Sequence, residues 1–144
     1  MKVLVSACLL GRNCKYNGGN NYTARVEEFL ADKEIIPVCP EELAGLGTPR
    51  IPMEIVKGRL TDRDGRDLDE ILRRTVAEVV ESLKKEKIDL AILKARSPTC
   101  GAREIYDGTF SGTRIPGMGI FAQALKDAGI PVVDEEEEDY AVSG

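Results

Sequence analysis

Four short apolar segments alternate with helical patterns along this chain, and this alternation restricts the fold more than any other feature. The segments at 2–6, 35–38, 88–93 and 130–133 are rich in Val, Ile and Leu, which is typical of strands buried on both faces. Amphipathic or capped patterns at 24–33, 68–87 and 118–128 predict the intervening helices. We therefore predict a three-layer, Rossmann-like α/β domain with a mainly parallel sheet of about four to five strands.

The connections between these elements are uneven in length. Residues 55–63 predict a small hairpin or an edge strand, whereas the stretch after Pro40 and residues 95–117 are rich in Gly and Pro and are predicted to be loops. The chain has no internal repeat and no linker-like segment. We expect its 144 residues to form one domain, with residues 134–144 as an acidic C-terminal tail.

Three of the four cysteines follow predicted strands. Cys8 comes two residues after the first strand, Cys39 directly follows the second, and Cys100 lies in the loop after the third. The carboxyl ends of parallel strands share one edge of a sheet, where ligands bind in such folds. We therefore predict that these three cysteines meet at one site that holds a metal or an iron–sulfur centre. The alternative for each is an ordinary buried thiol.

The chain contains no histidine, which limits both metal binding and proton transfer. Proton transfer must then involve a carboxylate, Lys, Tyr, Cys or a bound water. A structural zinc site would need Cys14 as its fourth ligand, whereas three thiolates suit an iron–sulfur cluster with one open iron. A thiol-based redox enzyme would need a resolving cysteine, and only Cys8 with Cys14 offers such a pair. These alternatives stay open at the level of residue types and spacing.

Charge and hydropathy argue against two classes of partner. Six of the 25 acidic residues lie in the run 134–139, which is expected to be solvated, and the 20 basic residues nearly balance the rest. No basic stripe suits a nucleic-acid backbone. No apolar run reaches the roughly 20 residues that a bilayer requires, and the N-terminal run is too short for a signal peptide. We expect a cytoplasmic protein that binds neither nucleic acids nor membranes.

The residues around the cysteines resemble a bacterial family known as domain of unknown function 523, whose members include a thiouracil desulfidase. Several independent motifs match in order between about residues 3 and 133. The matching stretches are 5–11 (Val-Ser-Ala-Cys-Leu-Leu-Gly), 16–19 (Tyr-Asn-Gly-Gly), 37–41 (Pro-Val-Cys-Pro-Glu), 48–50 (Thr-Pro-Arg), 93–94 (Leu-Lys), 97–101 (Ser-Pro-Thr-Cys-Gly) and 105–112 (Ile-Tyr-Asp-Gly-Thr-Phe-Ser-Gly).

This resemblance implies a [4Fe–4S] cluster held by Cys8, Cys39 and Cys100. The open iron would take the sulfur of a small thiocarbonyl substrate such as 2-thiouracil, and water would replace that sulfur to give a carbonyl compound and sulfide. Many relatives have Asp where this chain has Asn17, and many lack a cysteine at position 14. The first departure bears on substrate and rate, and the second argues that Cys14 is not an obligatory ligand. The alternative function is a non-enzymatic zinc- or small-ligand-binding domain that uses the same cysteines.

Two polar residues close to the cysteines are candidate catalytic groups. Glu41, two residues after Cys39, either activates water or protonates the leaving group, or else it stabilises a helix N-terminus. Ser97, three residues before Cys100, either hydrogen-bonds the substrate or a cluster sulfide, or else it forms a turn. We predict both as catalytic residues.

Four further residues are candidates for substrate binding or for balancing charge. Tyr16 and Asn17 either bind the edge of a pyrimidine or shape the turn that follows them. Arg50 is predicted to bind substrate, and together with Lys94 it would offset the negative charge of three thiolates; the alternative for both is a solvated basic side chain.

Overall fold

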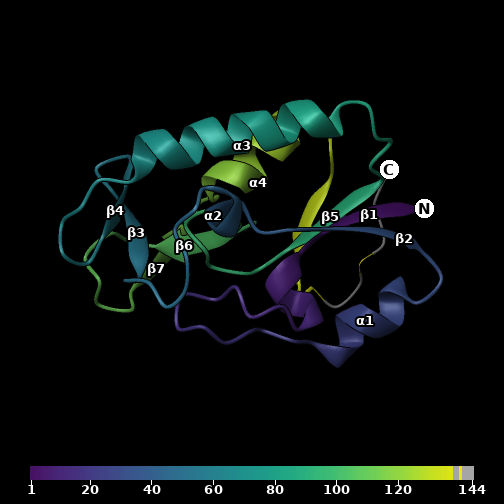
Figure 1. Ribbon diagram of the computed structural model, residues 1–144, viewed down its shortest axis with the longest axis horizontal. Coiled ribbons are helices and arrows are strands. Elements are labelled where there is room, and N and C mark those ends of the chain that lie inside the picture. Colours follow the sequence, from purple (N-terminus) through teal and green to yellow (C-terminus); the bar gives the residue numbers. More distant parts are fainter. Residues whose placement is uncertain (138–139, 141–144) are drawn as a thin grey trace.

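A computed structural model describes residues 1–137 and 140 and shows an α/β fold built on a parallel sheet (Figure 1). The predicted parallel sheet is confirmed: it has four strands, in the order β2-β1-β5-β8. Their bounds are β1 Lys2–Ser6, β2 Glu34–Val38, β5 Leu90–Leu93 and β8 Val132–Asp134. The helices are η1 Ala7–Leu10 (a 3-10 helix), α1 Ala24–Leu30, α2 Pro40–Leu43, α3 Asp69–Leu83 and α4 Ile120–Asp127.

Side chains on both faces of the sheet are buried. Leu4 of β1 and Leu93 of β5 belong to one apolar cluster together with residues of α3 and α4, including Leu72. Val3 on the same strand as Leu4 belongs to a second cluster, which includes Val26 of α1. Helices α3 and α4 lie on one side of the sheet and α1 lies on the other (Figure 1). This three-layer arrangement explains why β1 and β5 read as continuous apolar runs.

Strand β2 differs from the predicted buried strand. It pairs only with β1 among the described strands, and Ile35 is largely exposed while Val38 is buried. Pro37 lies within β2. A proline has no backbone N–H to donate to a neighbouring strand, so it is tolerated mainly in edge strands. The position of β2 at the edge of the sheet therefore accommodates this proline.

The helices α1, α3 and α4 are shorter than their predicted ranges. Helix α3 ends at Leu83 instead of residue 87, and α1 ends at Leu30 instead of residue 33. Leu83 and Leu30 are the last buried residues of their helices, and charged residues follow within the next two positions. Isolated turns gain little without tertiary packing, so each helix stops where its buried face stops. Helix α4 begins two residues later and ends one residue earlier than predicted.

Two antiparallel hairpins stand apart from the main sheet. The predicted hairpin at 55–63 is confirmed as β3 Met53–Val56 paired with β4 Arg59–Asp62. Its turn residues Lys57 and Gly58 both have positive φ, which matches the twist of a two-residue hairpin. The second hairpin, β6 Glu104–Tyr106 with β7 Arg114–Pro116, lies in the stretch predicted to be a loop. Its strands have only three residues each, too few for a periodic pattern to stand out.

The described part of the acidic run is not a solvated tail. Asp134 ends β8 and is buried, where it pairs with Arg103. Glu135 and Glu136 also make ion pairs with the body of the protein, and the side chain of Tyr140 is buried in the second apolar cluster. Within the described residues, no helix is both long and apolar enough to cross a bilayer.

Candidate functional site

A cavity of about 500 Å³ opens at the carboxyl edge of the sheet, and all four cysteines line it. Cys8 lies in η1 directly after β1, Cys39 precedes the first turn of α2, and Cys100 lies in the turn after β5. The structure therefore brings together three thiols from three strand ends that are far apart in the sequence. Cys14 joins them from the loop that follows η1.

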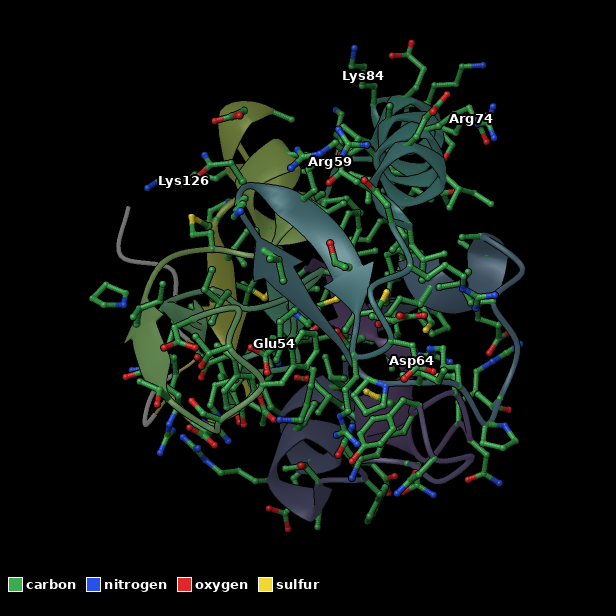
Figure 2. The ribbon with its side chains drawn as sticks, turned by 90° about the vertical axis from the view of Figure 1, so that its left-hand side faces the viewer. Glu54, Arg59, Asp64, Arg74, Lys84 and Lys126 are labelled. Carbon is green, nitrogen blue, oxygen red and sulfur yellow. The ribbon has the colours of Figure 1, made fainter. Side chains whose placement is uncertain are left out.

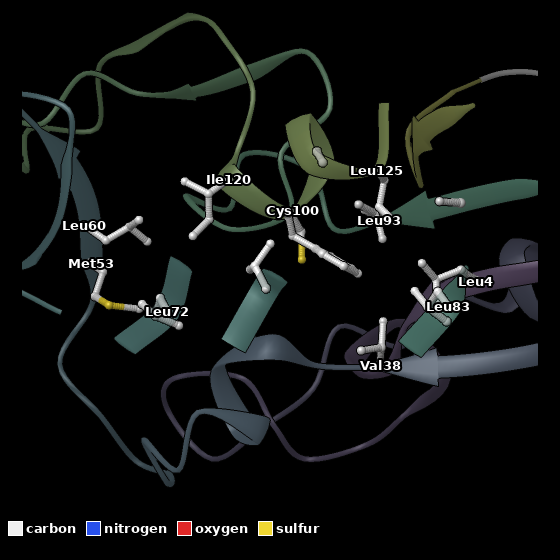
Figure 3. Close-up of a cluster of buried hydrophobic side chains, with 14 residues drawn as sticks. Leu4, Val38, Met53, Leu60, Leu72, Leu83, Leu93, Cys100, Ile120 and Leu125 are labelled. Atoms are coloured by element: carbon white, nitrogen blue, oxygen red, sulfur yellow. The ribbon is translucent and has the colours of Figure 1, made fainter. Parts of the chain in front are cut away.

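Cys100 is held in a tight turn. The Oγ of Ser97 accepts hydrogen bonds from the backbone N–H groups of Thr99 (3.1 Å) and Cys100 (3.0 Å), and the Gly101 N–H donates to the carbonyl of Ser97. The Cys100 side chain is 6% exposed and lies within the first apolar cluster (Figure 3). Ser97 thus forms the turn, and its hydroxyl proton is still available to a ligand in the cavity that it lines.

Cys14 is buried in the wall of the site. It is 1% exposed, and its carbonyl accepts a hydrogen bond from Arg50 (2.9 Å). Burial, reinforced by the neighbouring Cys39 sulfur, raises the pKa of the Cys14 thiol to about 12. A cysteine at this position is therefore a protonated thiol at neutral pH in the metal-free protein.

Burial also raises the pKa of two further thiols, those of Cys8 and Cys100. Burial raises the pKa of Cys8, although a hydrogen bond from Asn21 opposes the shift. Burial also raises the pKa of Cys100 well above its ordinary value, against a hydrogen bond with Ser6, and the neighbouring Cys8 and Cys39 sulfurs add to the shift. Several thiolates in one partly buried site repel one another, so the site favours a cation among them.

Glu41 and Arg50 form a pair at the same edge. Glu41 lines the cavity from the first turn of α2, with its Oε1 3.6 Å from the Nε of Arg50. Burial raises the pKa of Glu41, while the guanidinium of Arg50 opposes the shift. Arg50 also donates to the carbonyl of Gly47 (2.9 Å), and its buried Nε has no hydrogen-bond partner among the described residues. Arg50 therefore orients Glu41 and fixes the Cys14 loop, and its Nε is the donor left for a ligand.

The two predicted pyrimidine-binding residues lie in different places. Tyr16 lines the cavity and is 43% exposed, so its ring is accessible. Asn17 does not line the cavity; its Oδ1 accepts a hydrogen bond from the Gly19 N–H (2.9 Å) and shapes the turn. In this structure Asn17 therefore has the second of its two predicted roles, which is to shape the turn that follows it. Asn21, four residues later, lines the cavity beside Cys8.

Glu54 and Phe110 also line the cavity, and neither is among the predicted site residues, although Phe110 lies in the matching stretch 105–112. The Glu54 carboxylate is buried and accepts hydrogen bonds from the N–H groups of Gly108 (2.9 Å) and Phe110 (3.2 Å). Figure 2 shows Glu54 inside the molecule, in contrast to Arg74 and Lys84 on the outside. Phe110 has a φ of +56°, which is unusual for a bulky residue. Two hydrogen bonds to one buried carboxylate hold this conformation at the cavity wall.

Known proteins resemble this chain in sequence and in fold. A family model described as 2-thiouracil desulfurase matches residues 3–137, a range that contains every cavity residue named above. The chain belongs to this family. This desulfurase-family chain is 37% identical over 145 residues to the uncharacterized protein YbbK of Bacillus subtilis (strain 168), covering 94% of this chain and 96% of YbbK. It also matches the structure of the [4Fe–4S]-dependent thiouracil desulfidase TudS with a TM-score of 0.87 and 32% identity, over 95% of this chain and 92% of TudS.

The donor set of this desulfurase-family chain fits an iron–sulfur cluster. Among residues 1–137 and 140, no group of three or more His, Cys, Asp or Glu side chains could hold a metal ion. Tetrahedral zinc would need all its thiolates within about 2.3 Å of one point. Here the thiols surround a cavity, and soft thiolates without imidazole select iron–sulfur clusters, zinc or copper(I). The all-thiol lining of the cavity is therefore a donor set that an iron–sulfur cluster accepts.

Proposed function

We propose that this protein is a [4Fe–4S]-dependent desulfidase that removes sulfur from a thiolated pyrimidine such as 2-thiouracil. In this proposal, Cys8, Cys39 and Cys100 hold the cluster, and Cys14 does not. The observation that carries it is the meeting of thiols from three parallel strand ends at one cavity, in a member of the 2-thiouracil desulfurase family that has no histidine. The reaction converts a C=S group and water into a C=O group and hydrogen sulfide.

The cluster, when bound, supplies a Lewis-acidic iron that has no cysteine ligand and is open to the substrate sulfur. The protein supplies binding and proton transfer. Attack of water on the thiocarbonyl carbon requires a proton to leave the water and a proton to reach the departing sulfur. Without histidine, a carboxyl group with a raised pKa is the residue type suited to both transfers near neutral pH.

Glu41 is the carboxyl group placed for these transfers. Its pKa is raised by burial, so it can accept a proton from water and return it within one turnover. Arg50 holds the carboxylate from one side at 3.6 Å and keeps it directed along the cavity wall. We assign Glu41 the role of general base and acid. The charge of Arg50 orients the Glu41 carboxylate, and its Nε–H, which has no hydrogen-bond partner among the described residues, is available to donate to the substrate.

Ser97 and Tyr16 complete the proposed site. The Ser97 hydroxyl, whose oxygen already accepts two backbone hydrogen bonds, donates its proton to the ring carbonyl of the substrate or to a sulfide. The exposed ring of Tyr16 covers the substrate at the cavity mouth. Lys94 also lines the cavity. Its positive charge lowers the pKa of Cys8, although burial has the larger and opposite effect, and so favours thiolates at the site.

The test is anaerobic purification followed by reconstitution with iron and sulfide. We expect a brown protein with about four iron and four sulfide per chain. Cys8→Ser, Cys39→Ser and Cys100→Ser should each lose the cluster, whereas the matched control Cys14→Ser should keep it. The loaded parent should release sulfide from 2-thiouracil, and Glu41→Gln should keep the cluster but lose most of that activity.

Two results would overturn the proposal. A parent protein that stays colourless after reconstitution has no cluster. One tightly bound zinc per chain that is lost in Cys14→Ser would instead establish the four-cysteine zinc site.

A further inference from the structure

The loop between β5 and β6 carries Ser97 and Cys100, and its first residues have an unusual backbone. Arg96 has a φ of +66°, in the left-handed region that residues other than Gly, Asn and Asp seldom adopt. Such a conformation persists only where neighbouring groups hold it. Lys94, Ala95 and Arg96 all line the cavity, so whatever fixes them also fixes one wall of the site.

Glu135 contacts this loop directly. Its Oε1 accepts a hydrogen bond from the backbone N–H of Ala95 at 2.6 Å, and its Oε2 lies 2.9 Å from the Nζ of Lys94. The Glu135 side chain is only 10% exposed, so water screens these contacts weakly. A single carboxylate thus holds both the main chain and a side chain at the start of the loop.

The neighbouring acids repeat the pattern. Glu136 accepts two parallel hydrogen bonds from the guanidinium of Arg96, both at 2.7 Å. Asp134 accepts two from Arg103 at 3.0 Å, beyond the cysteine turn. Three consecutive carboxylates therefore engage three basic residues of the one loop. Paired Arg–carboxylate hydrogen bonds fix geometry as well as charge.

Tyr140 links Glu135 to helix α1. The hydroxyl of Tyr140 donates to the carbonyl of Glu135 at 2.8 Å, and its buried ring meets Phe29 edge-on with 5.2 Å between ring centroids. The guanidinium of Arg25 lies over the same ring at 4.6 Å. Through Tyr140 on one side and Ala95 on the other, Glu135 therefore connects α1 with the loop that carries Cys100.

We infer that the acidic segment 134–137 positions the β5–β6 loop for catalysis, with Glu135 and Glu136 as positioning residues that hold Ser97 and Cys100 in place. The inference rests on the proposed function for its catalytic consequence. The positioning itself is a property of the folded chain and can be measured separately.

The first test uses the backbone amides of residues 95–101 in the full chain, purified anaerobically, whatever its iron content. Glu135→Ala should speed hydrogen exchange of the Ala95 amide by about tenfold or more, because a buried N–H loses its acceptor. Glu135→Gln keeps an oxygen for that amide and should have a smaller effect. Glu81→Gln, which removes an exposed ion pair between Glu81 of α3 and Lys84 just after it, is the matched control and should leave residues 95–101 unchanged.

The second test exchanges the charges of Arg96 and Glu136. Arg96→Glu or Glu136→Arg alone sets like charges against each other and should speed exchange in the loop by about fivefold. The double variant restores the attraction and should return the rates to within about twofold of the parent. In cluster-loaded protein, the single variants should release iron to a chelator about tenfold faster, and the double variant should not.

The outcomes separate this inference from the proposed function. Parental exchange rates in Glu135→Ala and in both charge reversals would overturn the positioning role, even in a fully loaded and active enzyme. Faster exchange in those variants of a protein that never takes up a cluster would support positioning and overturn the proposed function instead. Exchange that is faster in the single reversals but not restored in the double variant would also count against the paired contact.

Discussion

The turn that carries Cys100 is packed against the start of α4, and Gly119 makes that packing possible. The N–H groups of Gly119, Ile120 and Phe121 donate to carbonyl oxygens of residues 98, 99 and 101, at 2.8 to 3.1 Å. These bonds give partners to N–H groups that a helix cannot satisfy internally. They also fix the backbone of Cys100, so a change at Gly119 should be felt at the cavity.

Replacing Gly119 with Ala tests this packing. The contacts of the added Cβ indicate how large the loss in the free energy of unfolding should be. An added Cβ would lie 2.4 Å from the carbonyl carbon and oxygen of Thr99 and 2.7 Å from the nitrogen of Cys100, whereas ordinary contact begins near 3.4 Å. The turn and the helix must therefore separate by about 1 Å. The φ of Gly119 is −66°, so crowding and not backbone conformation is the cause. We expect a loss of about 1–3 kcal/mol in the free energy of unfolding.

The assay is thermal unfolding of the cluster-free chain together with iron content after reconstitution. The loss corresponds to a fall in the melting midpoint of roughly 2–12 °C, and displacement of Cys100 should lower the iron content as well. Gly19→Ala is the control, because its added Cβ would meet only the flexible amide of Asn17 at 3.0 Å. A Gly119→Ala protein with the parental midpoint and full iron content would refute the reasoning.

Three other perturbations have defined outcomes. Because burial raises the pKa of Glu41, its contribution to stability is intact below the ordinary value of 4.5 and is lost as the pH rises through the raised pKa. Glu41→Gln should therefore raise the melting midpoint of the cluster-free protein more at neutral pH than at acidic pH, and a difference independent of pH would contradict this. Gly108→Ala should cost about 1–3 kcal/mol more than Gly112→Ala in urea unfolding, because both glycines have positive φ but only the first would bring a Cβ within 2.6 Å of the carbonyl oxygen of Ile55. Equal losses of stability in the two variants would show that the cost comes from the positive φ and not from the contact with Ile55. The raised pKa of Cys8 and Cys100 means that binding must displace protons, so cluster assembly followed by absorbance should slow as the pH falls, and equal rates across the range would argue against thiolate ligands.

The parts of the fold that the sequence predicts are those set by local patterns. The strands β1 and β5 read as apolar runs because both of their faces are covered, and the hairpin at β3 and β4 follows from its turn. The convergence of Cys8, Cys39 and Cys100 also follows, since residues just after parallel strands must lie at one edge. These predictions need only the order of elements and the direction of the sheet.

The parts that the sequence does not predict depend on contacts between distant segments. Nothing near Glu54 indicates that its carboxylate will hold a loop 54 residues away at Gly108. The run at 134–139 looks like a solvated tail because its partners, among them Arg96 and Arg103, are about 30 to 40 residues earlier and carry no shared pattern. Asn17 and Asn21 both lie in a loop rich in Asn and Gly, and only the path of that loop decides which one faces the cavity.

The candidate centre is shaped by contacts within the protein's own backbone and core. Cys8 is held by a 3-10 helix, Cys39 by its place between β2 and α2, and Cys100 by the Ser97 turn against α4, each through backbone contacts within the protein. Both apolar clusters extend well beyond the cavity, so most of the buried area remains when the thiols stand alone. A small zinc domain, in contrast, is unfolded without its metal. Folding thus provides the free energy that brings the thiols together. The free energy of iron binding then has to outweigh only the loss of the thiol protons and the mutual repulsion of the thiolates.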